Sequence, residues 1–228
     1  PEIKDLVNFL NKMGCKIKWI GKRTVKIFGV KKFKEINYKI MADRIEAGTY
    51  LIAAALTQGN LKITGLDPKI IKTEINILEK IGAKIILGRN EIKIQGKKKI
   101  KNINIKTAPY PGFSTDLQAQ IMVLLCMANK RSIIREKIFE NRFMHVPELI
   151  RMGANIEVQG GIAKVTGVNK LKGAPVMATD LRASVSLILA GLASSGETVI
   201  SRVYHLDRGY ENIEKKLSNC GANIRRFK

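Results

Sequence analysis

Residues 81–85 read Ile-Gly-Ala-Lys-Ile, and this short pattern decides the fold because it returns at nearly constant intervals. The four copies are centred on Gly14, Gly82, Gly153 and Gly221, which stand 68, 71 and 68 residues apart. The residue after the glycine is small each time, Cys15 in the first copy and alanine in the other three. A fixed period of this kind indicates that one structural unit is repeated along the chain.

The residues before each glycine predict a helix. In residues 70–78, for example, apolar side chains recur at the three- and four-residue spacing of an amphipathic helix. A glycine directly after such a stretch suits the left-handed conformation that ends many helices. The small residue that follows is expected where a strand passes close to the helix.

Strands and a second helix follow within each unit. Segments with alternating apolar and polar residues predict half-buried strands at residues 24–28, 91–95 and 163–167. A helix then opens at Asp43, Asp116 and Asp180, and aspartate is a preferred N-cap because its carboxylate accepts hydrogen bonds from free backbone N–H groups. These helices are rich in alanine and lead into further strands at residues 60–64, 131–135 and 197–201.

The repeated unit is therefore about 70 residues of helix, strands, helix and strand, which is an α/β architecture. The chain begins inside a unit, at the amphipathic stretch 5–10, with no strand and no initiator methionine before it. We therefore expect a fragment whose N-terminal part is missing.

Composition indicates a globular protein of one or two domains, because 45% of the 228 residues are apolar and 26% are charged. The longest apolar run, residues 121–128, is far below the ~18 residues that span a bilayer. No secretory signal is recognisable at the start. Cys15, Cys126 and Cys220 are odd in number and lack metal-ligand spacing, so we expect reduced thiols in buried small-residue positions and a cytoplasmic protein.

The formal net charge of +22 raises the possibility of a basic repeat module that binds nucleic acid. The lysines, however, are scattered among isoleucine and asparagine, as an AT-biased coding sequence would produce. The densest run, Lys97-Lys98-Lys99 with Lys101, contains no aromatic residue that could stack on bases. Biased composition is therefore the favoured explanation, and we expect no nucleic-acid partner and no membrane partner.

Four segments place acids and arginines at element boundaries, where side chains often face ligands. Helix N-termini together with Arg142, Arg182 and Arg208 would make an anion site, because guanidinium groups match phosphate and carboxylate. For any single residue, a capping aspartate or a solvated arginine is the simpler explanation. His145 and His205 have no acid or cysteine at metal-ligand spacing and are read as structural. The four segments are residues 107–116, 139–145, 178–184 and 204–211.

The same segments, with Ala42-Asp-Arg-Ile-Glu-Ala-Gly-Thr49, carry a close resemblance to the UDP-N-acetylglucosamine 1-carboxyvinyltransferase family of enolpyruvyl transferases. Among them are Thr107-Ala-Pro-Tyr-Pro-Gly-Phe-Ser-Thr-Asp-Leu-Gln-Ala-Gln120 and Phe139-Glu-Asn-Arg-Phe-Met-His-Val-Pro-Glu-Leu149. The resemblance runs through the whole chain in order and fits the C-terminal half of such an enzyme. It implies two domains, each an inside-out α/β barrel of three units with helices inside and sheets outside. Residues 1–41 would be the tail of the N-terminal domain, and residues 42–228 the C-terminal domain.

The resemblance also implies a reaction and its residues. The enolpyruvyl group of phosphoenolpyruvate would pass to the 3-hydroxyl of UDP-N-acetylglucosamine, the first committed step of peptidoglycan synthesis, with no cofactor and no metal. Asp116 matches the candidate base and sugar contact, and Ile138 a sugar-nucleotide contact through its backbone. Arg208 matches the arginine that meets the phosphoenolpyruvate phosphate. Supporting cleft residues are Asp180, Arg182 and Arg142.

One departure from the family pattern limits these expectations. The resemblance implies a proton-donating cysteine and a Lys-Asn pair that holds phosphoenolpyruvate. Neither has a counterpart here, so we expect the chain to be inactive alone. The related shikimate-pathway enolpyruvyl transferase is the nearest competing interpretation, although it lacks the string at residues 139–145. The sequence is also compatible with a nucleic-acid-binding repeat module and with a non-catalytic remnant.

Overall fold

The computed structural model describes residues 1–227, and the chain divides into two compact units at Asp43/Arg44. In the first unit, α1 (Glu2–Lys12) is followed by an antiparallel hairpin of β1 (Lys16–Trp19) and β2 (Val25–Phe28). The hydroxyl of Tyr38 donates to the Asp5 carboxylate at 2.7 Å and so ties the segment after the hairpin to α1. Large apolar side chains remain exposed in this unit, among them Ile20, Ile27, Phe33 and Ile40.

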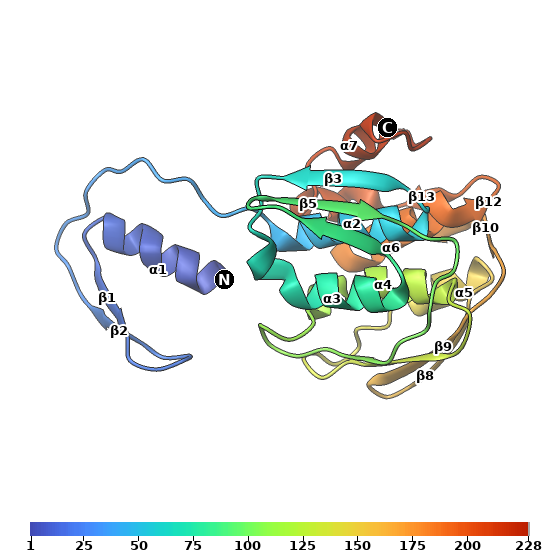
Figure 1. Ribbon diagram of the computed structural model, residues 1–228, viewed down its shortest axis with the longest axis horizontal. Coiled ribbons are helices and arrows are strands. Elements are labelled where there is room, and N and C mark those ends of the chain that lie inside the picture. The colour runs from blue at the N-terminus through green and yellow to red at the C-terminus, as the bar shows by residue number, and fades with distance from the viewer. Residues whose placement is uncertain (228) are drawn as a thin grey trace. The chain divides into compact units, whose positions relative to one another are not determined.

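Three helices form the interior of the second unit, and each packs against the other two. They are α2 (Arg44–Leu56), α4 (Gln118–Cys126) and α6 (Leu181–Ala193). All nine residues of α4 are buried, which explains why these helices are apolar on nearly every side instead of along one stripe. Figure 1 shows β3 and β5 lying across α2, so helices are inside and strands outside.

The first two repeats of this unit each carry a sheet. In the first repeat, β5 (Glu91–Gln95) pairs antiparallel with both β3 (Asn60–Thr64) and β4 (Lys84–Leu87). In the second, the strand order is β6 (Ile105–Lys106), β7 (Ser132–Arg135), β9 (Ile162–Thr166) and β8 (Asn155–Gln159). Alternate residues such as Ile92 and Ile94 are buried, as their period of two requires.

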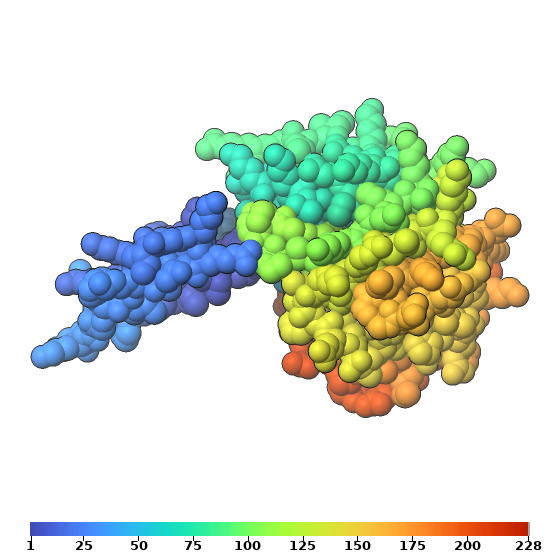
Figure 2. Space-filling model, turned by 90° about the horizontal axis from the view of Figure 1, so that it is seen from below, coloured from blue at the N-terminus to red at the C-terminus, as the bar shows by residue number. Residues whose placement is uncertain are grey.

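The third repeat is paired differently. Here β10 (Leu171–Lys172) lies parallel to β12 (Ser194–Ser195), and β11 (Pro175–Met177) lies parallel to β13 (Val199–Ser201). Figure 2 shows the repeats as successive bands of colour across the visible face of the second unit, from cyan through yellow to orange. Repeats that are consecutive in sequence are therefore neighbours in space.

Each outer helix ends at a repeat glycine, as the sequence predicts. Gly82, Gly153 and Gly221 have φ values of +119°, +90° and +94° and follow α3 (Lys72–Ile81), α5 (Val146–Arg151) and α7 (Ile213–Asn219). Glycine adopts this left-handed conformation without the steric penalty that a Cβ atom brings. The short helices η1 (Pro68–Ile71), η2 (Thr115–Leu117) and η3 (Val203–Arg208) precede α3, α4 and α7.

The predicted strands agree closely with the observed ones: residues 60–64 and 91–95 match β3 and β5, whereas β13 starts only at Val199. One prediction about the cysteines is wrong in part. Cys126 is fully buried, but Cys15 is half-buried and Cys220 is exposed. A small residue at the repeat joint allows a close contact but does not require one: Ala154 is buried, whereas Ala83 and Ala222 are only partly buried. No helix among residues 1–227 is long and apolar enough to cross a membrane.

Candidate functional site

The loop that leads into α4 is folded back on itself. The N–H of Ala108 donates to the carbonyl oxygen of Phe113 at 3.0 Å, and the Phe113 side chain is buried. Ser114 then caps the turn η2, because its hydroxyl accepts a hydrogen bond from the N–H of Asp116 at 3.2 Å. The prediction that Asp116 is an N-cap is therefore wrong. Ser114 does the capping, which leaves the Asp116 carboxylate available for other partners.

Those partners are two arginines from other parts of the second unit. The Arg182 Nε donates to Asp116 Oδ1 at 2.7 Å, and Arg182 Nη2 contacts the same oxygen. Arg142 Nη1 lies 3.5 Å from it. Asp116 is 38% exposed and Arg142 only 15%. A single carboxylate thus meets two guanidinium groups at a half-buried position, and the cluster keeps a net positive charge that suits an anionic ligand.

The burial of Arg142 and the charges around it shift its pKa. Burial and the neighbouring charge of Arg182 lower the pKa of Arg142, while Asp116, Glu136 and Asp180 oppose that shift. The guanidinium stays charged because its ordinary pKa lies so high. Arg142 Nη1 is also buried without a hydrogen-bond partner among residues 1–227, as is Gln118 Nε2 at the start of α4. Buried donors of this kind are normally satisfied, so they mark where a ligand oxygen could be accepted.

Asp180 behaves as the sequence predicts. Its Oδ1 accepts from the N–H groups of Arg182 at 2.7 Å and Ala183 at 3.0 Å, so it caps α6. Because Arg182 lies in the first turn of that helix, the cap also fixes where the Arg182 side chain begins. The structure thus brings Asp116, Arg142, Arg182 and Asp180 into one neighbourhood.

Two other predicted residues, Ile138 and Arg208, make no hydrogen bond or ion pair with the Asp116 carboxylate in the described part of the chain. The N–H of Ile138 donates to Glu136 Oε1 at 2.8 Å, so a backbone contact from Ile138 to a ligand would have to use its carbonyl oxygen. Arg208 is the last residue of η3 and is exposed. Within residues 1–227 no ion pair joins it to a carboxylate, and the structure does not bring it into the Asp116 cluster.

Sequence reasoning missed a buried hydrogen-bond network beside the cluster. Gln120 Nε2 donates to the carbonyl oxygen of Asp116 at 2.9 Å, to Thr49 Oγ1 at 3.2 Å and to the Tyr210 hydroxyl at 3.3 Å. Thr49 Oγ1 and the Tyr210 hydroxyl oxygen are 2.8 Å apart and share a hydrogen bond. The network joins α2, α4 and the segment after η3. The signal that could have indicated it was the pair of glutamines, Gln118 and Gln120, in an otherwise apolar helix.

His145 adds no charge to the cluster at neutral pH. His145 is buried, and burial lowers its pKa to about 4 against a weaker opposing effect of Asp180. It is therefore neutral at pH 7, which supports the structural interpretation. Residues 1–227 contain no group of three or more histidine, cysteine, aspartate and glutamate side chains arranged to hold a metal ion.

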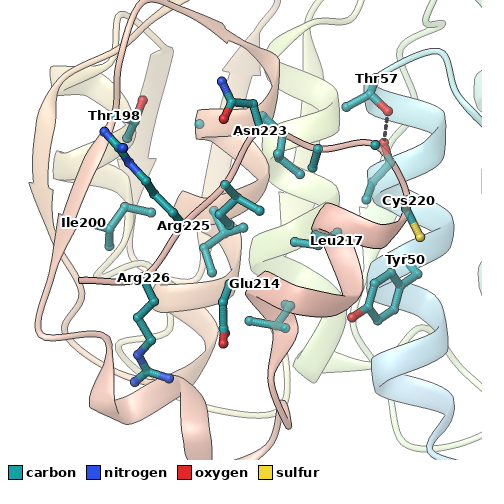
Figure 3. Close-up of a pocket in the computed structure, with 18 of the residues that line it drawn as sticks. Tyr50, Thr57, Thr198, Ile200, Glu214, Leu217, Cys220, Asn223, Arg225 and Arg226 are labelled. Carbon is teal, nitrogen blue, oxygen red and sulfur yellow. Dashed lines mark hydrogen bonds between the residues drawn. The ribbon is translucent and has the colours of Figure 1, made fainter. Parts of the chain in front are cut away.

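A cavity of about 1070 Å³ lies between residues of the first repeat, such as Tyr50 and Leu61, and residues of the third, such as Ile200 and Leu217. Figure 3 shows Tyr50 of α2 and Thr57, the residue after that helix, on one side of the cavity, and Leu217 and Glu214 of α7 also lining it. Its remaining wall includes Ile200 of β13 and the segment that follows Gly221. None of the predicted site residues lines it.

Comparisons with known proteins give a consistent answer. The family model described as EPSP synthase (3-phosphoshikimate 1-carboxyvinyltransferase) matches residues 1–217. UDP-N-acetylglucosamine 1-carboxyvinyltransferase of Pelagibacter ubique is 72% identical over 227 residues, which cover 100% of this chain and 54% of that protein. The Rickettsia prowazekii protein of the same name is 54% identical over 99% of this chain and 54% of its own length. The chain spans about half the length of the curated relatives it matches.

Solved structures agree on the fold. The enolpyruvyl transferase NikO from Streptomyces tendae matches with a TM-score of 0.88 and 29% identity, covering 98% of this chain and 54% of that one. EPSP synthase from Acinetobacter baumannii matches with a TM-score of 0.75 and 18% identity over 97% of this chain and 55% of that chain, which speaks for the fold alone. The predicted enolpyruvyl transferase fold, with its repeated α/β units, is confirmed.

Proposed function

This chain belongs to the EPSP synthase family, and we propose that it supplies one half of an enzyme that transfers the enolpyruvyl group of phosphoenolpyruvate to the 3-hydroxyl of UDP-N-acetylglucosamine. The observation that carries this proposal is the 72% identity to the P. ubique enzyme of that name along the whole chain. The arrangement of Asp116 between Arg142 and Arg182 adds a chemical reason, because it gathers a base and two cations at one place.

The reaction needs a base for the sugar hydroxyl. We assign this role to Asp116, whose carboxylate is neither buried nor used as a cap. As the hydroxyl oxygen bonds to the central carbon of phosphoenolpyruvate, its proton passes to the carboxylate and the methylene carbon takes up a proton. Phosphate then leaves together with one proton of the new methyl group, which restores the double bond of the transferred enolpyruvyl group. General-base catalysis of this kind contributes about 10²–10⁴ in rate.

Cations are needed for the anionic substrates. Arg182 and Arg142 provide charge beside the base, and Asp180 positions Arg182 by capping its helix. We propose that Arg208 meets the phosphate of phosphoenolpyruvate and that Ile138 contacts the sugar nucleotide through its carbonyl oxygen. The exposure of Arg208 leaves it accessible to a ligand.

The remaining functions belong to the part of the relatives that this chain does not span. We propose that this part supplies the acid that protonates the enolpyruvyl group, that residues 1–41 belong with it, and that residues 42–228 form the other domain. The division observed at Asp43/Arg44 lies two residues from that proposed boundary. The reaction would place the protein in peptidoglycan synthesis in the cytoplasm, and hence in cell-wall formation, cell shape and division.

The test joins this chain to the part of the P. ubique relative that it does not span, and we call the product the completed protein. We expect it to release phosphate from phosphoenolpyruvate when UDP-N-acetylglucosamine is the acceptor, whereas residues 1–228 alone release none. Activity with shikimate 3-phosphate instead would favour a shikimate-pathway enzyme. Phosphate release by residues 1–228 alone would contradict the proposed division of labour.

A further inference from the structure

Glu136 follows the last residue of β7, and its carboxylate is buried where two segments of the candidate site meet. Only 5% of the residue is exposed. Oε1 accepts hydrogen bonds from Thr107 Oγ1 at 2.8 Å and from the N–H groups of Ile138 at 2.8 Å and Phe139 at 3.2 Å. Oε2 accepts from Thr115 Oγ1 at 2.9 Å. Two hydroxyls and two backbone N–H groups thus satisfy one buried acidic group, which would be costly to leave unpaired.

The donors belong to the segments that carry the site. Thr115 directly precedes Asp116, and Thr107 opens the loop that ends there. The Thr107 hydroxyl also accepts from the N–H of Lys137 at 2.8 Å, so the loop and the turn after Glu136 are joined twice. Moving the carboxylate would therefore move the backbone on both sides of it.

The turn held by Glu136 leads to Arg142. The guanidinium carbon of Arg142 lies 4.2 Å from the centre of the Phe139 ring, a cation–π distance, and the Phe139 N–H is one of the four donors. Arg142 in turn lies 3.5 Å from Asp116. These contacts therefore form a closed chain of residues. It runs from Glu136 through Phe139, Arg142 and Asp116 to Thr115, and from Thr115 back to Glu136.

We propose that Glu136 is a positioning residue for the Asp116 site: by binding both segments it fixes the distance between the Asp116 carboxylate and Arg142. This inference rests on the proposed function for its catalytic consequence, but the positioning itself can be measured without any substrate. Glu136 has no need to touch a ligand, because it acts through Thr115 on one side and Phe139 on the other.

Two substitutions separate hydrogen bonding from a general need for a buried side chain. In Glu136→Gln the amide oxygen can keep the three donors of Oε1, while the NH₂ group faces Thr115, whose hydroxyl can rotate to accept. Glu136→Ala removes every acceptor. Leu217→Ala is the matched control, since Leu217 packs in a core cluster with Val185 and Ile213 that includes neither Glu136 nor any of its donors.

The first measurement is amide hydrogen exchange at Ile138 and Phe139 in the 228-residue chain. We expect Glu136→Ala to exchange at least tenfold faster at both positions than Leu217→Ala, and Glu136→Gln to stay within threefold of the unsubstituted chain. Equal exchange in Glu136→Ala and Leu217→Ala would overturn the proposal, and so would a Gln variant as fast as the Ala variant.

The second measurement is turnover by the completed protein. We expect Glu136→Ala to lower kcat at least thirtyfold and Glu136→Gln to restore it to within fivefold, with Leu217→Ala near the unsubstituted rate at a temperature where it is folded. A Glu136→Ala variant with normal kcat would overturn the proposal. If the unsubstituted completed protein has no transferase activity, the proposed function fails, and the exchange data still decide the role of Glu136.

Thr115→Val provides a test if Glu136→Ala does not fold. It removes only the bond to Oε2, so exchange at Ile138 and Phe139 should be unchanged while the Asp116 amide exchanges at least fivefold faster. An unchanged Asp116 amide would overturn the link between Glu136 and the Asp116 turn.

Discussion

The starts of α4 and α6 occupy equivalent places in two repeats, yet their aspartates interact differently. Asp180 caps its own helix, whereas the turn at Asp116 is capped by Ser114. The residue two positions before the aspartate explains the difference: it is Ser114 in the second repeat and the buried Ala178 in the third. A serine hydroxyl can accept the N–H bond and an alanine cannot. One hydroxyl therefore frees a carboxylate to meet arginines instead of backbone.

If the two aspartates differ in this way, the largest effect should come from Asp116→Asn in the completed protein. Turnover should fall by about 10²-fold or more, because an amide cannot take the hydroxyl proton. The free energy of unfolding should change by less than about 1 kcal/mol, because the half-exposed pair with Arg182 contributes little and the carboxylate caps nothing. Steady-state phosphate release and urea unfolding measure the two quantities. Near-normal turnover with a large stability loss would assign Asp116 to structure.

The pH dependence of stability tests how deeply His145 is buried near the start of α6. Burial lowers its pKa to about 4 from an ordinary 6.5, so the unfolded chain binds a proton that the folded chain excludes between these values. The contribution of this group to the free energy of unfolding is fully present above pH 6.5. It falls by about 3 kcal/mol as the pH is lowered to 4. We expect the difference in unfolding free energy between the unsubstituted chain and His145→Gln to change by that amount between pH 7 and 4. A constant difference would show that His145 takes up its proton while folded.

The capping role of Asp180 gives the next effect. Asp180→Ala should lower the free energy of unfolding by about 1–2 kcal/mol, whereas Asp180→Asn should cost only a few tenths, because asparagine caps nearly as well. Urea denaturation of the three chains measures this. Equal losses for alanine and asparagine would mean that the charge near Arg142, rather than the cap, is what Asp180 contributes.

The smallest effect is expected for Ser114→Ala, which should cost about 0.5–1 kcal/mol in the same denaturation experiment, through loss of the cap on η2. Replacement by threonine should recover most of it, since its hydroxyl can cap as well. If Ser114→Ala left stability unchanged, Asp116 would have taken over the cap, and turnover of the completed protein would then fall with it.

The repeat was predictable because its signals are local. A glycine after an amphipathic stretch and an alternation of apolar residues depend on near neighbours in sequence, and Gly82 and β5 followed from them. The segment 222–227 shows the limit of such signals. It continues the pattern of the strands β4 and β8 but forms no strand, and β4 and β8 are both paired with another strand, a requirement that a local pattern does not report.

The site was predictable in part. Asp116, Asp180, Arg142 and Arg182 could be selected because they stand at element boundaries. The sequence did not indicate that Ser114 would be the cap, nor that Glu136 would be buried with four donors, because both outcomes depend on contacts between distant segments. Arg208 shows the converse, since its motif is specific but its side chain is exposed and makes no ion pair within residues 1–227.

Gln120 bears on how a protein made of copies of one unit can diverge. Four residues after the starting aspartate, the three repeats carry Ala47, Gln120 and Ser184. Ser184 bonds back to the carbonyl oxygen of its aspartate at 2.7 Å, as Gln120 does at 2.9 Å, but only the longer amide also reaches Thr49 and Tyr210. The Gln120 side chain is fully buried, so its amide depends on these partners. Duplicated units must therefore have lost their interchangeability at this position, and a domain rebuilt from three identical copies of the second repeat would bury three amides without the Thr49 and Tyr210 hydroxyls that satisfy one.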